Sequence, residues 1–417
     1  MSAVTLTEQI KLIANKEEAS EFYEFTDWYS NVATDISEKV FKENPRMSFR
    51  DINKKYYYHV RQTYGLKAQM TQSIFKTVEA RYKSVDEQMK EQTYRVYDKT
   101  ENKTYSFQKD VNWLYKPIRF DRPQADLVRG RDWTWKDGMK RISVATLNGR
   151  LVLKYQCRPD SRLFNPEWKQ GGAKLVYHDT DKHWYLHISV TKEFPDETRD
   201  TLLGVEGHDR GLINIVTTRT DKWTTRYESG SEIAKVRNNY DNVRASLQKK
   251  GTKGAKRVLK RISGRENRMM SDVNHRISKA LTTECGKHKL HVLENLEGIS
   301  FEEKLLNNRT AEGRHDLRNW TFYSLETKMD YKAKMNNGLM IKVNPRYTSQ
   351  RCPHCGNIDK EARNRENHIY HCEKCNLTWN DDEVAGMNLQ ELGIRYIKGE
   401  DNPCFTKPKK EEDNNSK

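Results

Sequence analysis

The sequence contains no run of about 18 apolar residues, the length from which a membrane-spanning helix is predicted. Residues 1–20 also lack the apolar core of a secretion signal. We therefore expect an intracellular, cytoplasmic protein without a membrane partner. Only seven of the 417 residues are cysteine. Because a reducing cytosol does not maintain disulfides, paired cysteines are better interpreted as metal ligands than as a disulfide framework.

Positive charge, by contrast, is in excess. The chain has 75 Lys and Arg against 59 Asp and Glu, a formal net charge of +16, and only 35% hydrophobic residues. Cations that neutralise phosphates release condensed counterions, so a basic chain suits a polyanionic partner. A basic surface kept for solubility is the alternative, but the clustering of the cations among aromatic residues favours nucleic acid. The length predicts roughly two to four domains.

Residues 17–92 place their large side chains at helical spacing and predict a small helical bundle. The spacing is carried by Phe22, Phe25, Trp28 and Tyr29 and by Ile74, Val78 and Tyr82. Within this block, cations flank a run of aromatic rings at residues 54–61. Such a run is either a core stripe with solvated lysines or a surface that contacts phosphates and stacks on bases. The candidate nucleic-acid contacts are Lys54, Lys55, Tyr57 and Arg61.

Residues 94–190 change to short alternating strands. Asn148-Gly149 predicts a hairpin turn, because both residues accept a positive φ, and the flanking strands are expected at 142–147 and 151–155. A second hairpin is expected from 174–177 and 184–190. Several strands without intervening helices predict a small antiparallel barrel, a fold that often binds oligonucleotides.

From Leu202 onward, strands alternate with long helical stretches and predict a mixed α/β domain. The strands are expected at 202–209, 212–217 and 289–294.

A helix-rich insertion at 231–285 interrupts this domain, and Gly251 and Gly254 are expected to split it into two helices. Between Ser246 and Arg265 it carries eight cations and no acid. A solvated charged face is one interpretation of such a run, and a face that follows a phosphate backbone is the favoured one. The candidate contacts are Lys249, Lys250, Lys253, Lys256, Arg257, Lys260 and Arg261.

Two C-x-x-C pairs predict a zinc site. Cys352 and Cys355 are separated from Cys372 and Cys375 by sixteen residues, a spacing typical of a tetrahedral four-thiolate site. Four thiolates leave no open position, so one structural zinc ion is expected. Alternative ligands are three histidines, His354, His368 and His371. The other three cysteines, Cys157, Cys285 and Cys404, are expected to be ordinary packing residues.

Three acids stand at ends of predicted elements. Asp209 and Glu294 close apolar strands, and Asp382 begins a helix in which the small residues Ala385 and Gly386 allow close approach to a sheet. Magnesium prefers oxygen ligands, and two such ions about 4 Å apart can hydrolyse a phosphodiester. Each acid alone has an ordinary interpretation, as a polar strand end or as a helix N-terminal acid that the helix dipole favours.

These segments together resemble the split RuvC-like nuclease of the TnpB and type V CRISPR effector superfamily, in which a zinc ribbon precedes the third acidic motif. The resemblance covers about residues 202–397 and is closest to the miniature type V-F CRISPR-associated effectors. The motifs that carry it are 207–211, 292–296, 347–356 and 382–388, with 272–278 similar to the helix before the second acidic motif.

The resemblance implies a multidomain α+β protein. An N-terminal antiparallel β-barrel, the wedge, would carry a helical recognition insertion, and an RNase H-like (RuvC) α/β nuclease domain would contain the four-cysteine zinc ribbon. The implied bounds are 1–16 and 93–198 for the wedge, 17–92 for the recognition domain, 199–345 and 379–398 for the nuclease, 346–378 for the ribbon, and 399–417 for a disordered tail.

The resemblance also implies an RNA-guided DNA endonuclease of a prokaryotic cell, with guide RNA and target double-stranded DNA as partners. Asp209, Glu294 and Asp382 would bind two Mg²⁺ ions, and the ribbon would contact the target. Alternatives that stay open are a transposon-associated TnpB-like nuclease, a transposase that joins strands, and an inactive RNA-guided DNA-binding protein. One or two protein copies on one guide RNA are both open, because residues 22–29 fit either a core or a self-association surface.

The sequence departs from the family at the first acidic motif. His208 stands where an apolar residue is usual, and Glu206 competes with Asp209 for the first catalytic role. Strand alternation turns Glu206 to the opposite face, which favours Asp209. Asp381 likewise competes with Asp382, but only Asp382 stands six residues before Asn388, as in the family motif.

Overall fold

The computed structural model describes residues 1–90, 115–179, 181–211, 214–296, 322–364 and 367–406, and the backbone of 93–98 and 103–108. The chain divides into two compact units, Ala3–Glu193 and the part from Phe194 onward together with Met1–Ser2. None of the described helices combines the length and apolar character that a membrane span needs. Of the disordered tail expected at 399–417, residues 407–417 lie outside the described residues. Residues 399–406 are described, and Phe405 is buried in the core of the second unit, so the predicted start of the tail is wrong.

Three helices open the first unit, as the periodicity of residues 17–92 predicts. They are α1 (Lys16–Glu43), α2 (Phe49–Tyr64) and α3 (Ala68–Lys90). Asn15 and Glu18 form a reciprocal capping box at the start of α1, which satisfies backbone donors that the helix leaves free. Gly65, at φ 66°, ends α2 in the left-handed conformation that favours glycine.

The apolar stripe of α1 belongs to the core of this unit. Phe22, Phe25 and Tyr29 are at most 3% exposed. The ring of Phe22 lies 5.4 Å from that of Trp184 in the neighbouring sheet. The stripe is therefore not available as a surface for self-association.

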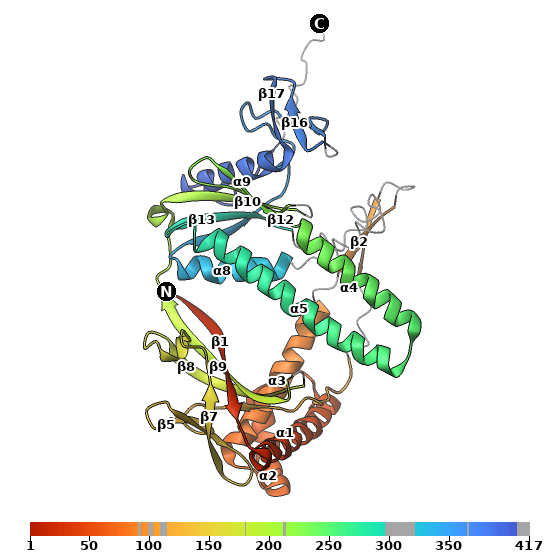
Figure 1. Cartoon of the computed structure of the whole chain (residues 1–417), viewed down its shortest axis with the longest axis vertical. Coiled ribbons are helices and arrows are strands. Elements are labelled where there is room, and N and C mark those ends of the chain that lie inside the picture. The colour runs from red at the N-terminus through yellow and green to blue at the C-terminus, as the bar shows by residue number, and fades with distance from the viewer. Residues whose placement is uncertain are drawn as a thin grey trace. The chain divides into compact units, whose positions relative to one another are not determined.

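A curled antiparallel sheet of seven strands forms the rest of the unit (Figure 1). Its strands lie in the order β4-β8-β9-β1-β7-β6-β5, and β2 and β3 form a separate two-stranded sheet. The bounds are β1 (Ser2–Ile13), β2 (Thr93–Asp98), β3 (Lys103–Gln108), β4 (Gln124–Leu127), β5 (Trp133–Lys136), β6 (Arg141–Ala145), β7 (Arg150–Gln156), β8 (Lys169–His178) and β9 (His183–Phe194). Short 3-10 turns lie at Arg162–Phe164 and Arg199–Thr201.

Both predicted hairpins are present. The β8–β9 hairpin closes at the pair His178 and His183, as expected. In the β6–β7 hairpin, the Thr146 N–H donates to the Gly149 carbonyl, so Leu147 and Asn148 occupy the turn, and the predicted turn is wrong by one residue. The buried pair Ile142 and Leu153 fixes this register, because a slip of one strand by one residue would turn its side chain out of the core.

The second unit contains the predicted mixed α/β domain. Its sheet has the order β12-β11-β10-β13-β14. Strands β10, β13 and β14 pair in parallel, β11 is antiparallel to β10, and β12 is antiparallel to β11. The strands are β10 (Gly204–Arg210), β11 (Asn214–Arg219), β12 (Thr225–Ser229), β13 (Lys289–Glu294) and β14 (Leu339–Val343), and the helices are α4 (Ser231–Lys250), α5 (Lys253–Thr282), α8 (Phe322–Met335) and α9 (Asp381–Ile397).

Helices cover both faces of this sheet. On one face α9 packs against Val205, Leu290 and Val292, and on the other α5 and α8 cover Val216 and Leu293 (Figure 1). Alternate residues of β10 and β13 therefore belong to two different cores. This division decides which polar side chains of the two strands meet.

The approach of α9 to β10 depends on two glycines. A Cβ at Gly207 would lie 2.3 Å from the Gly386 carbonyl oxygen and 2.5 Å from the Gln390 nitrogen. The expectation that small residues near Gly386 allow close helix–sheet contact is confirmed. This contact places the start of α9 beside the end of β10.

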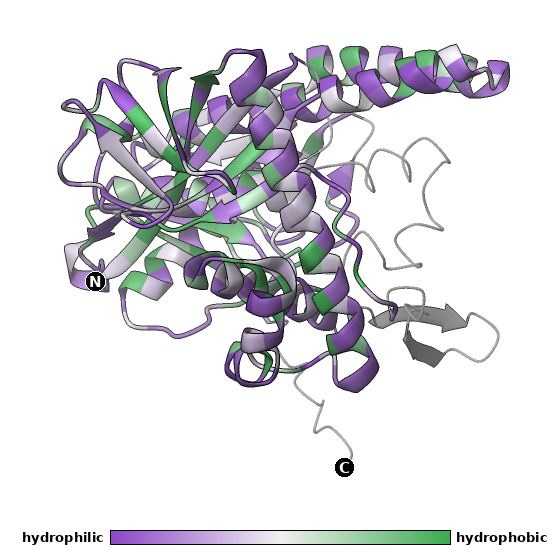
Figure 2. Ribbon diagram, turned by 90° about the horizontal axis from the view of Figure 1, so that it is seen from below, coloured by the Kyte–Doolittle hydropathy of each residue, from purple (hydrophilic) through white to green (hydrophobic). Residues whose placement is uncertain are grey.

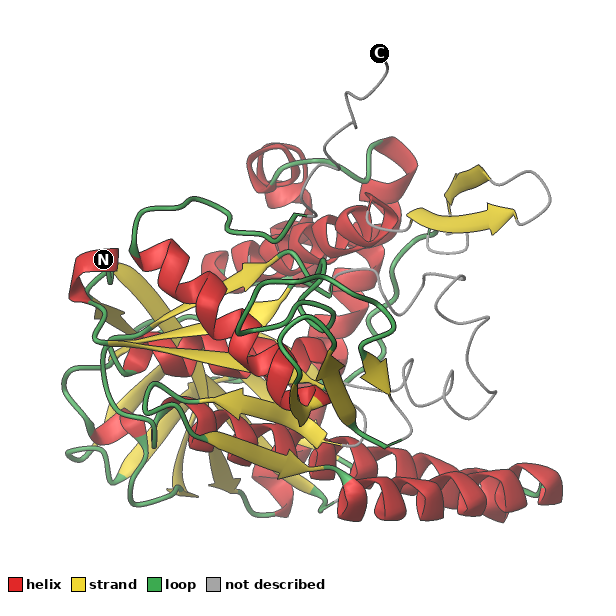
Figure 3. Ribbon diagram, turned by 90° about the horizontal axis from the view of Figure 1, so that it is seen from above, coloured by secondary structure: helices red, strands yellow, loops and turns green. Residues whose placement is uncertain are grey.

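The insertion forms two helices that lie side by side (Figure 3). Gly251, at φ 64°, ends α4 as predicted. Gly254 does not contribute to the break, because the Thr252 side chain accepts from the Ala255 N–H and α5 has already begun at Lys253. The prediction of a break at Gly254 is therefore wrong.

A three-stranded sheet precedes α9. It is formed by β15 (Arg363–Asn364), β16 (Ile369–Cys372) and β17 (Leu377–Asn380). Asn380 caps α9 by accepting a hydrogen bond from the Asp382 N–H at 3.0 Å. The cysteine-rich segment is thus continuous with the helix that carries the third acid.

Candidate active site and metal centres

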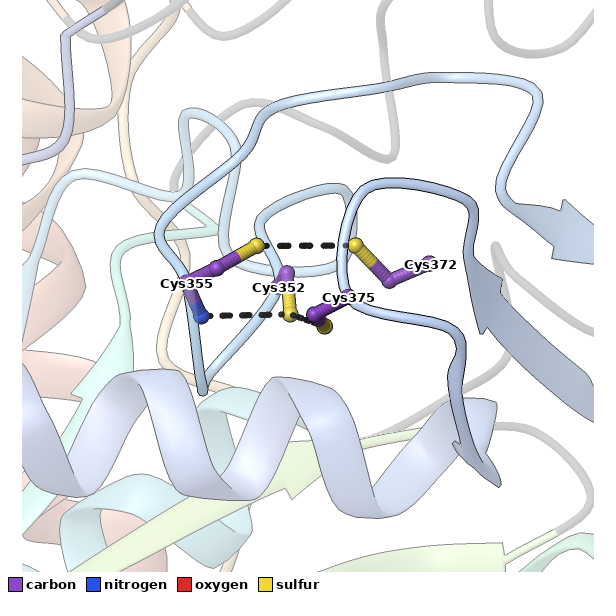
Figure 4. Close-up of side chains that lie close together, drawn as sticks. All are labelled: Cys352, Cys355, Cys372 and Cys375. Carbon is purple, nitrogen blue, oxygen red and sulfur yellow. Dashed lines mark hydrogen bonds between the residues drawn. The ribbon is translucent and has the colours of Figure 1, made fainter.

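The four predicted cysteines form one cluster (Figure 4). Their sulfurs lie within 4.8 Å of one another, with 3.6 Å between Cys352 and Cys375 and 3.6 Å between Cys355 and Cys372. A tetrahedral zinc site with Zn–S bonds of about 2.3 Å separates its sulfurs by about 3.8 Å. The thiols are free, and their spacing fits a zinc ion.

Both knuckles fold in the same way. Gly356, at φ 73°, and Asn376, at φ 54°, each follow the second cysteine of a pair. Their N–H groups donate to the backbone carbonyls of Cys352 and Cys372, the first cysteine of each pair. Backbone hydrogen bonding at Asn357 lowers the pKa of the Cys355 thiol to about 7, toward the thiolate that binds metal.

The alternative histidine ligands lie elsewhere. His354 is exposed, His371 contacts the Thr378 hydroxyl at 2.9 Å, and His368 contacts Asp381 at 3.2 Å. The four-cysteine group contains no histidine. The donor set of this cluster is therefore the four thiols.

The three predicted acids come together at one end of the α/β sheet. Parallel strands β10 and β13 pair His208 with Leu293, so Asp209 and Glu294 follow side by side. Asp382 lies in the first turn of α9, on the same face of the sheet. Burial, and then the charges of Glu294 and Asp382, raise the pKa of Asp209 well above its usual range.

Glu294 is held by neighbours that sequence reasoning missed. The Thr348 hydroxyl donates to its carboxylate, and Arg210 donates to its backbone carbonyl at 2.5 Å. Arg210 also pairs with Glu326 of α8 at 3.1 Å. Burial raises the pKa of Glu294, while the Thr348 hydrogen bond opposes the shift. Arg210 and Thr348 lie within the family motifs 207–211 and 347–356, and this position in the sequence already indicates that they belong to the site.

Asp382 has two polar partners. Asn214, at the start of β11, donates to its carboxylate at 3.0 Å, and Arg363 of β15 lies 3.7 Å away. The charge of Arg363 also lowers the pKa of Asp209 and of Glu294, against the effect of burial. Nothing in the sequence indicated Arg363, because only the folded ribbon carries it to the acids.

The competing acids are engaged elsewhere. Asp381 is 1% exposed and pairs with Arg363 at 2.8 Å and with His368 at 3.2 Å. Glu206 is buried on the sheet face opposite Asp209, as strand alternation predicts. Asn388 is fully buried and donates to the Thr348 and Arg351 carbonyls at 2.7 Å each, so it docks the cysteine segment on α9.

The candidate contacts on α2 divide between two faces. Ile52, Tyr56 and Val60 form the buried stripe. Lys54, Lys55 and Arg61 are exposed and Tyr57 is half-buried, although Lys55 pairs with Glu43 at 2.5 Å. One face of α2 is therefore a core stripe, and nucleic-acid contact by the exposed face stays a prediction.

The candidate cations of the insertion are exposed. Hydrophilic residues run along both helices of the pair (Figure 2). Ala255, Ile262 and Met270 form the buried side of α5. The exposed cations among the candidates are Lys249, Lys250, Lys253, Lys256, Arg257, Lys260 and Arg261.

The chain is similar in sequence to known proteins. Residues 322–389 match the model of the Cas12f1-like TNB domain. The CRISPR-associated endodeoxyribonuclease Cas12f1 of Sulfoacidibacillus thermotolerans is 30% identical over 254 residues, which are 57% of this chain and 56% of that protein. The TnpB-like protein MJ0751 of Methanocaldococcus jannaschii is 30% identical over 260 residues, 59% of this chain and 86% of that protein.

The fold agrees with these sequences. A Cas12f1 chain from a complex with single guide RNA and target DNA superposes with a TM-score of 0.55 at 11% identity, covering 93% of this chain and 99% of that one. The chain therefore belongs to the family of TnpB-like proteins related to Cas12f1.

Proposed function

We propose that this protein is a compact RNA-guided DNA endonuclease that cuts its target in a single RuvC-like site. The observation that carries the proposal is the convergence of Asp209, Glu294 and Asp382 from three separate elements, close enough that two of them raise the pKa of the third. Its relatives Cas12f1 and the TnpB-like protein support the substrate class. The strand order and the two helical layers support an RNase H-like nuclease domain.

The residues of the site suggest how the reaction would proceed. Asp209, Glu294 and Asp382 would hold two Mg²⁺ ions, which when bound supply an activated water and neutralise charge that develops on the phosphate. Asn214 and Thr348 orient two of the carboxylates. Arg363 places a positive charge near the acids, where a phosphate would approach. Asp381 positions Arg363 through its ion pair.

The remaining parts would handle nucleic acid. The curled sheet with helices α1–α3 would serve as wedge and recognition lobe, holding guide RNA and reading a short motif beside the target, with contacts from α2. The four-cysteine ribbon, held by one structural zinc ion, would contact the target. The exposed cations of α4 and α5 would follow a phosphate backbone. One or two copies of the chain would assemble on each guide.

A TnpB-like, transposon-associated nuclease is the second candidate. It is favoured by the match to 86% of the length of MJ0751. Chemistry does not separate it from a CRISPR effector, since both would use the same acids. Only the bound RNA distinguishes the two.

The first experiment purifies the chain with its RNA and measures cleavage of matched DNA in Mg²⁺. Asp209→Asn and Asp382→Asn are expected to lower cleavage by roughly 10³-fold or more, because several kcal/mol of charge stabilisation is lost, while RNA and DNA binding persist. Asp272→Asn, at an exposed acid of α5 that pairs with Arg276, is the matched control. Retained cleavage in Asp209→Asn, or loss of DNA binding with it, would contradict the role of this acid.

Sequencing of the copurified RNA completes the test. Many RNAs that share a constant part and differ in a variable part indicate a CRISPR effector. A single RNA encoded beside the protein's own gene indicates the TnpB-like alternative. A preparation that cuts DNA without any RNA would contradict RNA guidance.

A further inference from the structure

The face of β10 opposite Asp209 carries a second cluster of metal-ligand side chains. Glu206 and His208 of β10 and His291 of β13 are 1%, 0% and 1% exposed. Glu206 and His291 are direct neighbours in the parallel register. One donor atom from each residue lies within 4.8 Å of the other two. We propose that these three side chains form a second, buried site for a divalent metal of the zinc type.

The donors converge with defined orientations. His208 Nδ1 contacts the Thr218 hydroxyl at 2.8 Å, which turns Nε2 toward His291 Nδ1 at 3.0 Å. Glu206 Oε2 lies 3.9 Å from the same His291 nitrogen. Metal-bound histidines usually use the second ring nitrogen in this way, to fix the ring against a polar neighbour.

One carboxylate oxygen lacks a partner. Glu206 Oε2 is fully enclosed and accepts no hydrogen bond from the described part of the chain. A buried polar atom without a partner is costly, and native proteins rarely leave one. A cation between Glu206 and the two imidazoles would satisfy this oxygen.

The distances fit a small tetrahedral ion. Bonds of about 2.0–2.1 Å to nitrogen and oxygen separate tetrahedral ligands by about 3.3 Å. The observed pairs, 3.0 Å and 3.9 Å, lie on either side of this value.

The chemistry of the donors selects the metal. Two imidazoles and one carboxylate suit zinc and its neighbours, whereas magnesium and calcium prefer oxygen alone. A neutral imidazole carries a lone pair on one ring nitrogen, and this is the form of histidine that binds a metal.

Such an ion would link the strands of the acidic site from behind. His208 directly precedes Asp209, and His291 lies three residues before Glu294. A metal shared by β10 and β13 would fix the separation of the two strands whose ends carry these acids. The metal site itself does not depend on the proposed nuclease function.

Metal content tests the proposal. The full chain is loaded with Zn²⁺ in excess Mg²⁺, freed of unbound metal, and analysed by atomic emission. The wild type is expected to retain one zinc ion more than Glu206→Gln and His291→Gln, which keep the side-chain sizes. His371→Gln and Asp382→Asn are controls and should retain the wild-type content. Equal zinc in wild type and His291→Gln, or an ion lost with Asp382→Asn instead, overturns the site.

A variant could lose zinc because it misfolds, so a second measurement uses the wild-type protein. Zinc-edge X-ray absorption of the wild type, in excess Mg²⁺, is expected to show sulfur near 2.3 Å together with imidazole nitrogen near about 2.0–2.1 Å. A shell of sulfur alone means that only the four-cysteine cluster holds zinc, and it overturns the proposal.

Discussion

The four-cysteine cluster and the acidic site were both predicted from sequence, yet they are built in opposite ways. All four sulfurs come from one segment of 24 residues, Cys352 to Cys375, and lie ready for a metal. The three acids come from positions 209, 294 and 382 and meet only through the sheet and α9. The cluster is closed and can stabilise the fold, whereas the acids repel one another until a cation arrives.

The largest expected effect concerns the closed site. Cys352→Ser should prevent zinc binding at the four-cysteine cluster and unfold the ribbon around residues 352–380, because a structural zinc site contributes on the order of 10 kcal/mol. Hydrogen exchange should show lost protection in this segment and unchanged protection in Ala3–Glu193. Cleavage should also fall, since Arg363 and the start of α9 are attached to the ribbon.

His371→Gln provides the matched control, because His371 neighbours Cys372 but contacts Thr378. This variant should keep its zinc and its protection. A Cys352→Ser protein that remains fully protected would show that the cluster does not depend on metal, and the contrast between the two sites would disappear.

The contrast also explains what sequence could and could not predict. Local spacing was sufficient to predict the cysteine knuckles, the helices of residues 17–92 and the existence of the two hairpins. It was insufficient where register or packing decides, as in the β6–β7 turn, which Ile142 and Leu153 fix, and at Gly254, which Thr252 leaves inside α5.

Some functional groups come together only through tertiary structure and could not be predicted from sequence spacing. Arg363 reaches Asp382 across the ribbon, and no spacing in the sequence announces this contact. Strand alternation correctly separated Glu206 from Asp209, but it did not indicate that Glu206 would meet a histidine of another strand. Groups that converge from distant segments are visible only after the sheet has formed.

The acidic site should also depend on the close packing of α9 against β10. Gly207→Ala should destabilise the second unit by about 3 kcal/mol, the upper range for overpacking, because the new Cβ meets backbone atoms of α9 that cannot rotate away. Chemical denaturation measures the loss. The displaced helix carries Asp382, so cleavage should fall as well.

Gly264→Ala is the control for this glycine. Its Cβ would approach only the end of the Arg268 side chain, at 3.3 Å, and alanine favours a helix interior. Stability should therefore be unchanged or slightly higher. A Gly207→Ala protein of normal stability would show that α9 does not need its close contact with β10.

A smaller effect follows from the raised pKa of Asp209. Because its folded pKa lies above the unfolded value, its protonated form stabilises the fold. This contribution is complete below the ordinary pKa of about 4 and is lost as pH rises through the folded pKa. Without divalent metal, stability relative to Asp209→Asn should therefore decline with rising pH. Mg²⁺ should restore it in the wild type only, and thermal unfolding with EDTA or Mg²⁺ measures both.

The smallest expected effect concerns the exposed cations of α5, which lie apart from both metal centres. Lys256→Gln should lower the slope of log affinity against log salt by about 0.7 to 0.9 if this lysine neutralises one phosphate. Lys235→Gln, on α4, is the control, because Lys235 already pairs with Glu232 at 2.8 Å. Identical slopes in wild type and Lys256→Gln would mean that this lysine lies on a solvated face. The affinity for nucleic acid would then depend on cations other than Lys256.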